Sequence, residues 1–123
     1  MKILVVDDER DVKDLFLQRF RKEIRKGELT LMFAFSGEEA LQTLDTMKQE
    51  AILILSDINM PGMSGLELLE KIKSNYVAPP PVVMMVTAYG DEENYTTAKR
   101  LGADDFLTKP VDFKLLKEKL LNA

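Results

Sequence analysis

The sequence of 123 residues contains neither cysteine nor histidine. Without cysteine the chain has no disulfide framework and no thiol nucleophile. Without histidine it lacks the commonest general base and metal-ligating side chain. Any chemistry that this chain supports must therefore use carboxylates, hydroxyl groups, lysines and metal ions.

Long hydrophobic runs and a strong positive charge are also missing. No apolar run approaches the ~18 residues that a membrane span needs, and the apolar start of the chain is too short for a signal peptide. The formal net charge of −4 argues against a nucleic-acid-binding surface over the whole domain. We therefore expect a cytoplasmic protein with no membrane partner and no direct nucleic-acid contact by this domain.

Short apolar segments at five places predict the strands of a buried sheet. The clearest is Ala51–Leu55, an unbroken apolar run that leads to Asp57 and a Pro-Gly turn, as in parallel strands covered on both faces. The other four are similarly short and lie at Lys2–Val6, Leu29–Ala34, Val82–Val86 and Asp105–Leu107.

Apolar residues at helical spacing predict a helix after each strand. The first runs from about Arg10 to Lys26 and is closed by Gly27. Side-chain caps open the other four, which are expected at about 36–47, 64–75, 91–101 and 112 onward. The last helix is expected to turn three leucines inward: Leu115, Leu116 and Leu120. Five β-α repeats with right-handed crossovers predict one α/β domain over residues 1–123, with helices on both faces of a parallel sheet.

Polar residues follow four of the five predicted strands: Asp7 and Asp8, Asp57, Thr87 and Lys109. The strand-to-helix loops of a parallel sheet open at one edge, where α/β proteins bind ligands. Taken singly, each residue has a purely structural explanation, because acids cap helices and form turns, threonines end strands and lysines are often solvated. Their convergence at one edge favours a functional site instead.

The chemistry that this combination supports is phosphoryl transfer. Three converging carboxylates would repel one another, and a hard divalent cation such as Mg²⁺ relieves that repulsion through oxygen ligands. The cation leaves room for a phosphate, which Lys109 and Thr87 can contact. Asp57 can then act as the nucleophile, since aspartyl phosphates are a known type of covalent intermediate and the transfer needs mainly positioning and charge neutralisation.

Five motifs keep a highly specific order and spacing along the chain: Val5–Glu9, Ser56–Gly62, Val86–Ala88, Gly102–Phe106 and Leu107–Pro110. With them the sequence resembles, over its whole length, the receiver domain of two-component response regulators. The resemblance implies a three-layer flavodoxin-like fold with five parallel strands in the order 2-1-3-4-5.

The resemblance also implies roles for the residues at the edge of the sheet. Asp57 matches the phosphoacceptor, and Lys109 matches the lysine that bridges to the phosphate. The implied cofactor is Mg²⁺, bound directly by Asp8, Asp57 and the backbone carbonyl of Asn59, while Asp7 acts through water. Because no required residue is missing, the motifs argue against a degenerate receiver that cannot be phosphorylated.

Thr87 and Phe106 match the family's switch pair. Phosphorylation is expected to draw Thr87 toward the phosphate and to let Phe106 fill the vacated space, where packing alone would hold a ring that has no hydroxyl. This repacks the face formed by the sparsely apolar helix at 91–101, the last strand and the last helix. The turn that contains Pro110 is expected to hold a cis peptide bond.

The implied partners follow from the same resemblance. A sensor histidine kinase or a histidine phosphotransfer protein supplies the phosphoryl group, and a downstream output domain or protein reads the switched face, which also offers a surface for a homodimer. The chain is not expected to be a turnover enzyme, since it would catalyse only its own phosphorylation and slow dephosphorylation. The sequence suits both a stand-alone receiver and a piece of a longer protein.

Two further features allow more than one interpretation. Tyr89 lies two residues after Thr87 and either shields the phosphoryl group from water or is a surface aromatic. Basic residues crowd the end of the first helix, where they complement the helix dipole or form a kinase-docking edge: Arg19, Arg21, Lys22, Arg25 and Lys26.

Two alternative functions come from other protein classes. A Mg²⁺-dependent phosphatase of the haloacid-dehalogenase type also uses an aspartyl nucleophile, but it needs a second Asp two residues later, where this chain has Asn59. A flavodoxin-type FMN carrier needs a phosphate loop rich in Ser and Thr after Val6, where Asp7 and Asp8 would repel the ligand.

Overall fold

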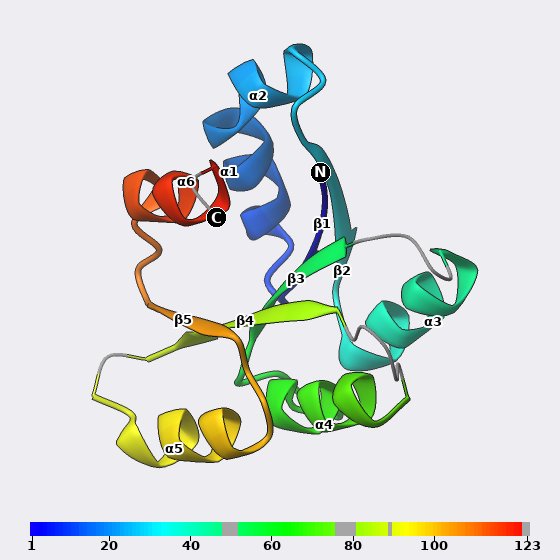
Figure 1. Ribbon diagram of the computed structural model, residues 1–123, viewed down its shortest axis with the longest axis vertical. Coiled ribbons are helices and arrows are strands. Elements are labelled where there is room, and N and C mark those ends of the chain that lie inside the picture. Colours follow the sequence, from blue (N-terminus) through cyan, green and yellow to red (C-terminus); the bar gives the residue numbers. More distant parts are fainter. Residues whose placement is uncertain (48–51, 76–80, 89, 122–123) are drawn as a thin grey trace.

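The computed structural model describes residues 1–47, 52–75, 81–88 and 90–121. Its strands are β1 (Lys2–Val6), β2 (Thr30–Ala34), β3 (Ile52–Asp57), β4 (Val82–Thr87) and β5 (Asp105–Thr108). All neighbouring strands pair in parallel, and the order is β2-β1-β3-β4-β5 (Figure 1). Both the parallel sheet and the order implied by the resemblance are confirmed.

The helices are α1 (Asp11–Arg19), α2 (Arg21–Arg25), α3 (Gly37–Met47), α4 (Gly65–Asn75), α5 (Glu92–Arg100) and α6 (Phe113–Leu121). Four of them begin at the side chains that the sequence indicated. The hydroxyl oxygens of Ser36 and Ser64 accept the backbone N–H groups of Glu39 and Glu67, at 3.1 and 3.2 Å. The carboxylates of Asp91 and Asp112 accept backbone N–H groups in the first turns of α5 and α6.

Side chains that alternate along each central strand pack into two separate hydrophobic cores, one on each face of the sheet. Leu4 and Val6 of β1 pack with α3, α4 and α5, whereas Ile3 and Val5 pack with α1 and α6. Figure 1 shows these two groups of helices on opposite faces of the sheet. Because both faces are covered, the strands must be apolar along their whole length, which explains the unbroken apolar runs.

The predicted helix over residues 10–26 is wrong in one respect, because it is divided at Phe20. Phe20 has φ −104° and ψ 17°, outside the helical region, although its N–H still donates to the carbonyl of Phe16 at 3.0 Å. Its ring is 1% exposed and lies 6.0 Å from the Phe16 ring and 6.1 Å from the Phe113 ring. We attribute the bend to this aromatic packing, which outweighs helical periodicity. Gly27 ends the segment with φ 74°, as predicted.

The prediction that Leu115 faces inward is also wrong, since 43% of it is exposed. Leu116 and Leu120 of the same helix are 1% and 3% exposed, as expected. Successive helical residues point about 100° apart, so Leu115 and Leu116 cannot share one narrow buried stripe. No helix among the described residues is long and apolar enough to cross a membrane.

Candidate functional site

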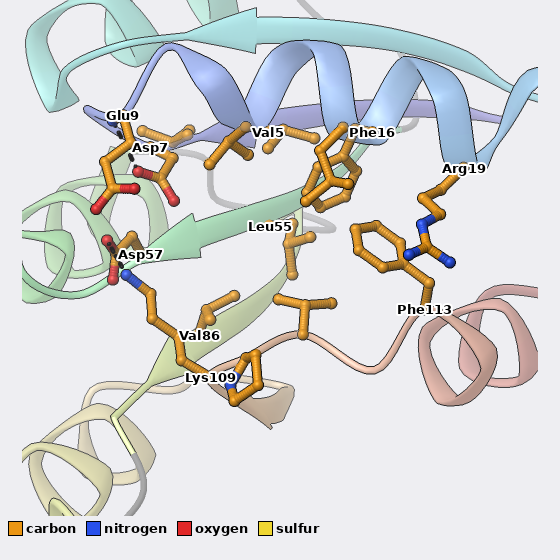
Figure 2. A pocket seen from close by; sticks show the side chains of 15 residues that line it. Val5, Asp7, Glu9, Phe16, Arg19, Leu55, Asp57, Val86, Lys109 and Phe113 are labelled. Atoms are coloured by element: carbon orange, nitrogen blue, oxygen red, sulfur yellow. Dashed lines mark hydrogen bonds and ion pairs between the residues drawn. The ribbon is translucent and has the colours of Figure 1, made fainter.

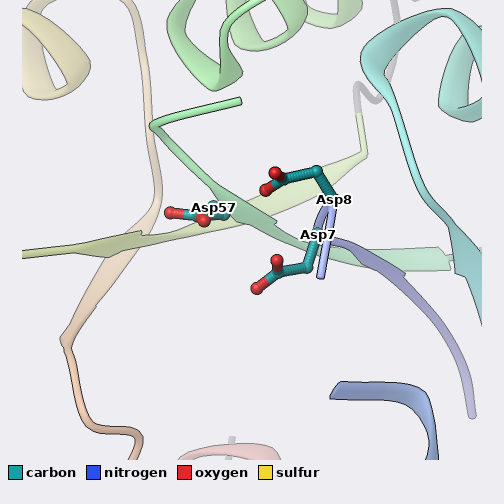
Figure 3. Close-up of side chains that lie close together, drawn as sticks. All are labelled: Asp7, Asp8 and Asp57. Atoms are coloured by element: carbon teal, nitrogen blue, oxygen red, sulfur yellow. The ribbon is translucent and has the colours of Figure 1, made fainter. Parts of the chain in front are cut away.

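The carboxyl ends of β1 and β3 bring three acidic residues together. Val6 of β1 pairs with Ser56 of β3, so Asp7 follows β1 beside Asp57 at the end of β3. Carboxylate oxygens of Asp7, Asp8 and Asp57 lie within 4.8 Å of one another (Figure 3). The predicted convergence of three carboxylates is present in the structure.

Asp57 is the most enclosed of the three and is held by Lys109. Its side chain is 4% exposed, and its Oδ2 accepts a hydrogen bond from Lys109 Nζ at 2.8 Å (Figure 2). Burial alone would lower the pKa of Lys109, but the hydrogen bond and charge of Asp57, with the charge of Asp7, raise it above its ordinary value. The lysine therefore stays charged beside the acids at neutral pH.

The loop after β5 delivers Lys109 to this edge. Its backbone N–H donates to the carbonyl of Thr87 at 2.8 Å, which ties the loop to the end of β4. The Lys109–Pro110 peptide bond is cis, as the resemblance implied.

The surroundings of Asp7 disfavour the negative charge of its carboxylate. Burial, together with the negative charges of Asp57 and Asp8, raises the pKa of Asp7 above its ordinary value. The N–H of Glu9, which donates to Asp7 Oδ1 at 2.9 Å, and the charge of Lys109 oppose this shift. Neither Asp7 nor Asp8 caps α1, because that helix begins at Asp11 and Arg10 precedes it. The capping explanation for these two acids is therefore wrong.

The donor set suits a hard divalent cation. The three carboxylates offer oxygen ligands, one of them with a raised pKa caused partly by its acidic neighbours, and such a cation relieves this repulsion. Asn59 lies exposed two residues beyond Asp57, in the loop between β3 and α4. The residues present thus fit Mg²⁺.

The two switch positions lie on the neighbouring strands. Thr87 ends β4 one residue after Val86, the pairing partner of Asp57, and it is 4% exposed. Phe106 of β5 is half-buried, and its ring lies 4.4 Å from the ring of Tyr95 on α5. The Phe106 ring thus packs against α5 in this structure, and its expected movement toward Thr87 stays a prediction.

Sequence reasoning missed Gly65. A Cβ on this residue would lie 2.0 Å from the carbonyl oxygen of Asp57, so the start of α4 packs directly on the backbone of the acceptor. The N–H of Gly65 also donates to the carbonyl of Ile58 at 2.8 Å. A glycine directly after the Ser64 cap, where any helix former would serve, was the signal that could have revealed this contact.

A pocket beside Asp57 was missed as well. It has a volume of about 620 Å³ and lies between α1 and the segment that joins β5 to α6. Figure 2 shows Asp7, Glu9, Asp57 and Lys109 at one end of this pocket and Arg19 with Phe113 at the other.

The two features with more than one interpretation stay undecided. Tyr89 lies outside the described residues. The five basic residues at the end of α1, in α2 and directly after it are exposed, and the Arg19 guanidinium lies 5.4 Å from the Phe113 ring centre. Exposure suits both interpretations of this basic cluster.

Comparison with known proteins places these observations in a family. A family model described as the response regulator receiver domain matches residues 3–121. The chain is 33% identical over 123 residues to a cyclic di-GMP phosphodiesterase of Thermotoga maritima, covering 100% of this chain and 31% of that protein. It is 33% identical over 120 residues to the chemotaxis protein CheY1 of Helicobacter pylori, covering 98% and 94%. The chain thus spans about a third of the first relative's length and nearly all of the second's.

The solved structures agree with the sequence relatives. A response regulator receiver protein from Pseudomonas putida superposes with a TM-score of 0.84 at 29% identity, covering 99% of this chain and 96% of that one. These matches give the haloacid-dehalogenase alternative no support. Receiver domains are phospho-accepting signalling domains that bind Mg²⁺ at an acidic pocket. The family match spans nearly the whole chain and includes every strand end that carries these acids, so the chain belongs to the response regulator receiver domain family.

Proposed function

We propose that Asp57 of this chain accepts a phosphoryl group from the phosphohistidine of a histidine kinase or a histidine phosphotransfer protein. The observation that carries the proposal is the environment of Asp57, a nearly buried carboxylate bound by Lys109 at 2.8 Å and clustered with two further acids. A buried acid at a strand end would be a costly structural element, so its presence beside a lysine and two further acids favours a chemical role.

Each acidic residue has a distinct part in this proposal. Asp8, Asp57 and the Asn59 carbonyl would hold Mg²⁺ directly, and Asp7 would act through water. The bound cation supplies positive charge that offsets repulsion between these carboxylates and the incoming phosphate. Asp57 attacks phosphorus with a carboxylate oxygen, and the bond from phosphorus to the donor nitrogen breaks.

Lys109 and Thr87 would receive the new phosphoryl group. Lys109 exchanges its contact with Asp57 Oδ2 for a phosphoryl oxygen, to which an ammonium group binds strongly as a point charge. Thr87 donates its hydroxyl to another oxygen. Phe106 then moves from its contact with Tyr95 toward the space that Thr87 leaves, so the surface made by α5, β5 and α6 changes.

The partners and domain extent belong to the same proposal. Residues 1–123 form one domain, which receives its phosphoryl group from a protein donor and passes the signal to an output domain or protein, with α5, β5 and α6 also serving a homodimer. The domain catalyses its own phosphorylation and slow dephosphorylation, and turns over no separate substrate.

The experiment that tests this proposal compares two aspartates. Wild type, Asp57→Asn and Asp112→Asn are incubated with Mg²⁺ and a phosphorylated histidine phosphotransfer protein, and phosphoryl incorporation is measured by intact mass. Wild type and Asp112→Asn should each gain one phosphoryl group, because Asp112 only caps α6. An Asp57→Asn protein that is phosphorylated at the wild-type rate would refute the assignment.

A further inference from the structure

The loop between β2 and α3 supplies no residue to the proposed site, yet it contacts both loops that hold the proposed cation ligands. The loop after β1 carries Asp7 and Asp8, and the loop after β3 carries Asn59. Strand β1 lies between β2 and β3, but its helix α1 covers the opposite face of the sheet. Helices α3 and α4 therefore meet across β1 and pack into one core (Figure 1).

Two contacts join the end of β2 to the acidic loop after β1. The N–H of Asp7 donates to the carbonyl of Ala34, the last residue of β2, at 3.1 Å. The Arg10 guanidinium lies 4.2 Å from the centre of the Phe35 ring, which is a cation–π distance. The segment that carries Asp8 is thus anchored on both sides to the end of β2 and the residue after it.

Two further contacts join α3 to the loop after β3. The N–H of Met63 donates to Glu38 Oε1 at 3.3 Å. The Met63 side chain packs so closely on Gly37 that a Cβ there would lie 2.7 Å from its Sδ. Met60 of the same loop is 8% exposed and packs in the core. Asn59 directly precedes Met60, so these contacts limit the movement of the Asn59 carbonyl.

We propose that Glu38 is a positioning residue for the cation site. By holding Met63 it fixes the loop after β3 relative to the acidic loop after β1, and this fixed spacing favours Mg²⁺ over the larger Ca²⁺. The inference rests on the proposed function, in which Asp8, Asp57 and the Asn59 carbonyl hold the cation. Glu38 is not a ligand in this proposal, because it acts only through the loop that carries Asn59.

The two cations respond differently to a displaced ligand. Mg²⁺ requires a nearly ideal octahedral arrangement with bonds of about 2.0–2.1 Å, whereas Ca²⁺ accepts irregular geometry and bonds of about 2.3–2.6 Å. A loop that is less firmly held should therefore weaken Mg²⁺ binding more than Ca²⁺ binding. The ratio of the two affinities reports the spacing of the loops, and a general loss of stability would leave this ratio unchanged.

Three substitutions in the first turn of α3 separate positioning from charge. Glu38→Ala removes the negative charge and the acceptor of the Met63 N–H. Glu38→Gln removes the same charge but keeps an amide oxygen that can accept this N–H. Glu39→Ala removes a negative charge from the neighbouring position. Both glutamates are exposed, so the fold should tolerate all three changes.

The experiment measures the dissociation constants of Mg²⁺ and Ca²⁺ for each protein by titration followed with amide NMR, without a phosphodonor. Glu38→Ala should weaken Mg²⁺ binding about threefold relative to Ca²⁺ binding, which is the effect of losing one ordinary hydrogen bond. Glu38→Gln and Glu39→Ala should keep the wild-type ratio of affinities, because the loss of a charge weakens the binding of both divalent cations alike.

Each failure has a distinct result. If wild type binds Mg²⁺ but Glu38→Ala keeps the wild-type ratio, the inference is overturned and the proposed cation site stands. An equal fall of the ratio in Glu38→Gln or Glu39→Ala would also overturn it, since charge and not position would then be the cause. If wild type binds no Mg²⁺, or if Asp57→Asn binds Mg²⁺ as tightly as wild type, the proposed cation site fails together with the inference.

Discussion

At the scale of single residues, the site combines stabilising and destabilising contacts. Lys109 pairs with Asp57, but Asp7 lies close to two other acids and has a raised pKa. A site that must receive a cation and a phosphate keeps its acids close together although this costs stability in the metal-free protein.

Asp7→Asn should therefore stabilise the metal-free protein at pH 7. Because the pKa of Asp7 is raised in the folded state, its negative charge lowers the free energy of unfolding at pH values above the folded pKa. This destabilisation disappears as the pH falls below the pKa of the unfolded state, near 3.9. Because solvent screens this half-exposed group, we expect a gain of about 1 kcal/mol or less. Asparagine can still accept the Glu9 N–H. Urea unfolding at pH 7 and pH 3 should show the gain only at pH 7; a loss of stability at pH 7 would contradict the account.

Gly65→Ala should destabilise the protein far more than Gly37→Ala. Both glycines begin helices, but a Cβ at Gly65 meets the backbone of Asp57, whereas one at Gly37 meets the flexible side chain of Met63. We expect a loss of roughly 3 kcal/mol or more for Gly65→Ala and about 1 kcal/mol for Gly37→Ala, measured by urea unfolding. Equal effects would show that the close approach to Asp57 matters little.

At the scale of elements, α5 is the least firmly anchored long helix on its face of the sheet. Ala98 is its one buried residue, whereas α4 buries Gly65, Leu68, Leu69 and Ile72. The Tyr95 ring of α5 lies 4.4 Å from the Phe106 ring and is tilted by 47° to it, so movement of Phe106 alters a side-chain contact of this helix. A segment can repack during signalling only if few buried contacts hold it in place.

Thr87→Ala should separate phosphorylation from switching. The variant keeps Asp57 and Lys109, so it should still gain a phosphoryl group, but it lacks the hydroxyl that is proposed to draw β4 toward the phosphate. Amide NMR should then show large phosphorylation-dependent shifts in α5 and β5 of wild type and Thr87→Ser, and shifts confined to the Asp57 loop in Thr87→Ala. Full α5 shifts in Thr87→Ala would exclude this coupling.

The sequence predicted elements well where one local signal decided them. The caps at Ser36, Ser64, Asp91 and Asp112 and the buried strand before Asp57 depend on neighbouring residues, and all are present. Strand order depends on which strands become neighbours in space, and apolar patterns carry no such information. It came only from the resemblance.

The wrong predictions from the sequence and the features that it missed both arise from tertiary contacts. The bend at Phe20 reflects packing against Phe16 and Phe113, the latter 93 positions further along the chain, and no helical periodicity encodes it. The contact of Gly65 with Asp57 and the pocket beside α1 likewise join distant segments. The acidic cluster could be predicted because parallel strands necessarily end at a common edge.

At the scale of the whole molecule, folding and metal binding should be linked. Only the folded chain places Asp7, Asp8 and Asp57 together, so Mg²⁺ should bind it far better than the unfolded chain. Mg²⁺ at a hundred times its dissociation constant should raise the free energy of unfolding by about 2.7 kcal/mol. Urea unfolding with and without EDTA checks this, and Asp57→Asn should lose most of the gain. Equal stabilisation of Asp57→Asn would place the cation elsewhere.

The central claim is that the phosphoryl group is stored on the carboxylate of Asp57. Borohydride reduces an aspartyl phosphate to homoserine, so trapping the phosphorylated protein and mapping its peptides by mass spectrometry identifies the acceptor directly. The account predicts homoserine at position 57, only after treatment with donor and Mg²⁺. Homoserine at Asp7 or Asp8, or a phosphoryl group that survives on a hydroxyl side chain with Asp57 unchanged, would contradict it.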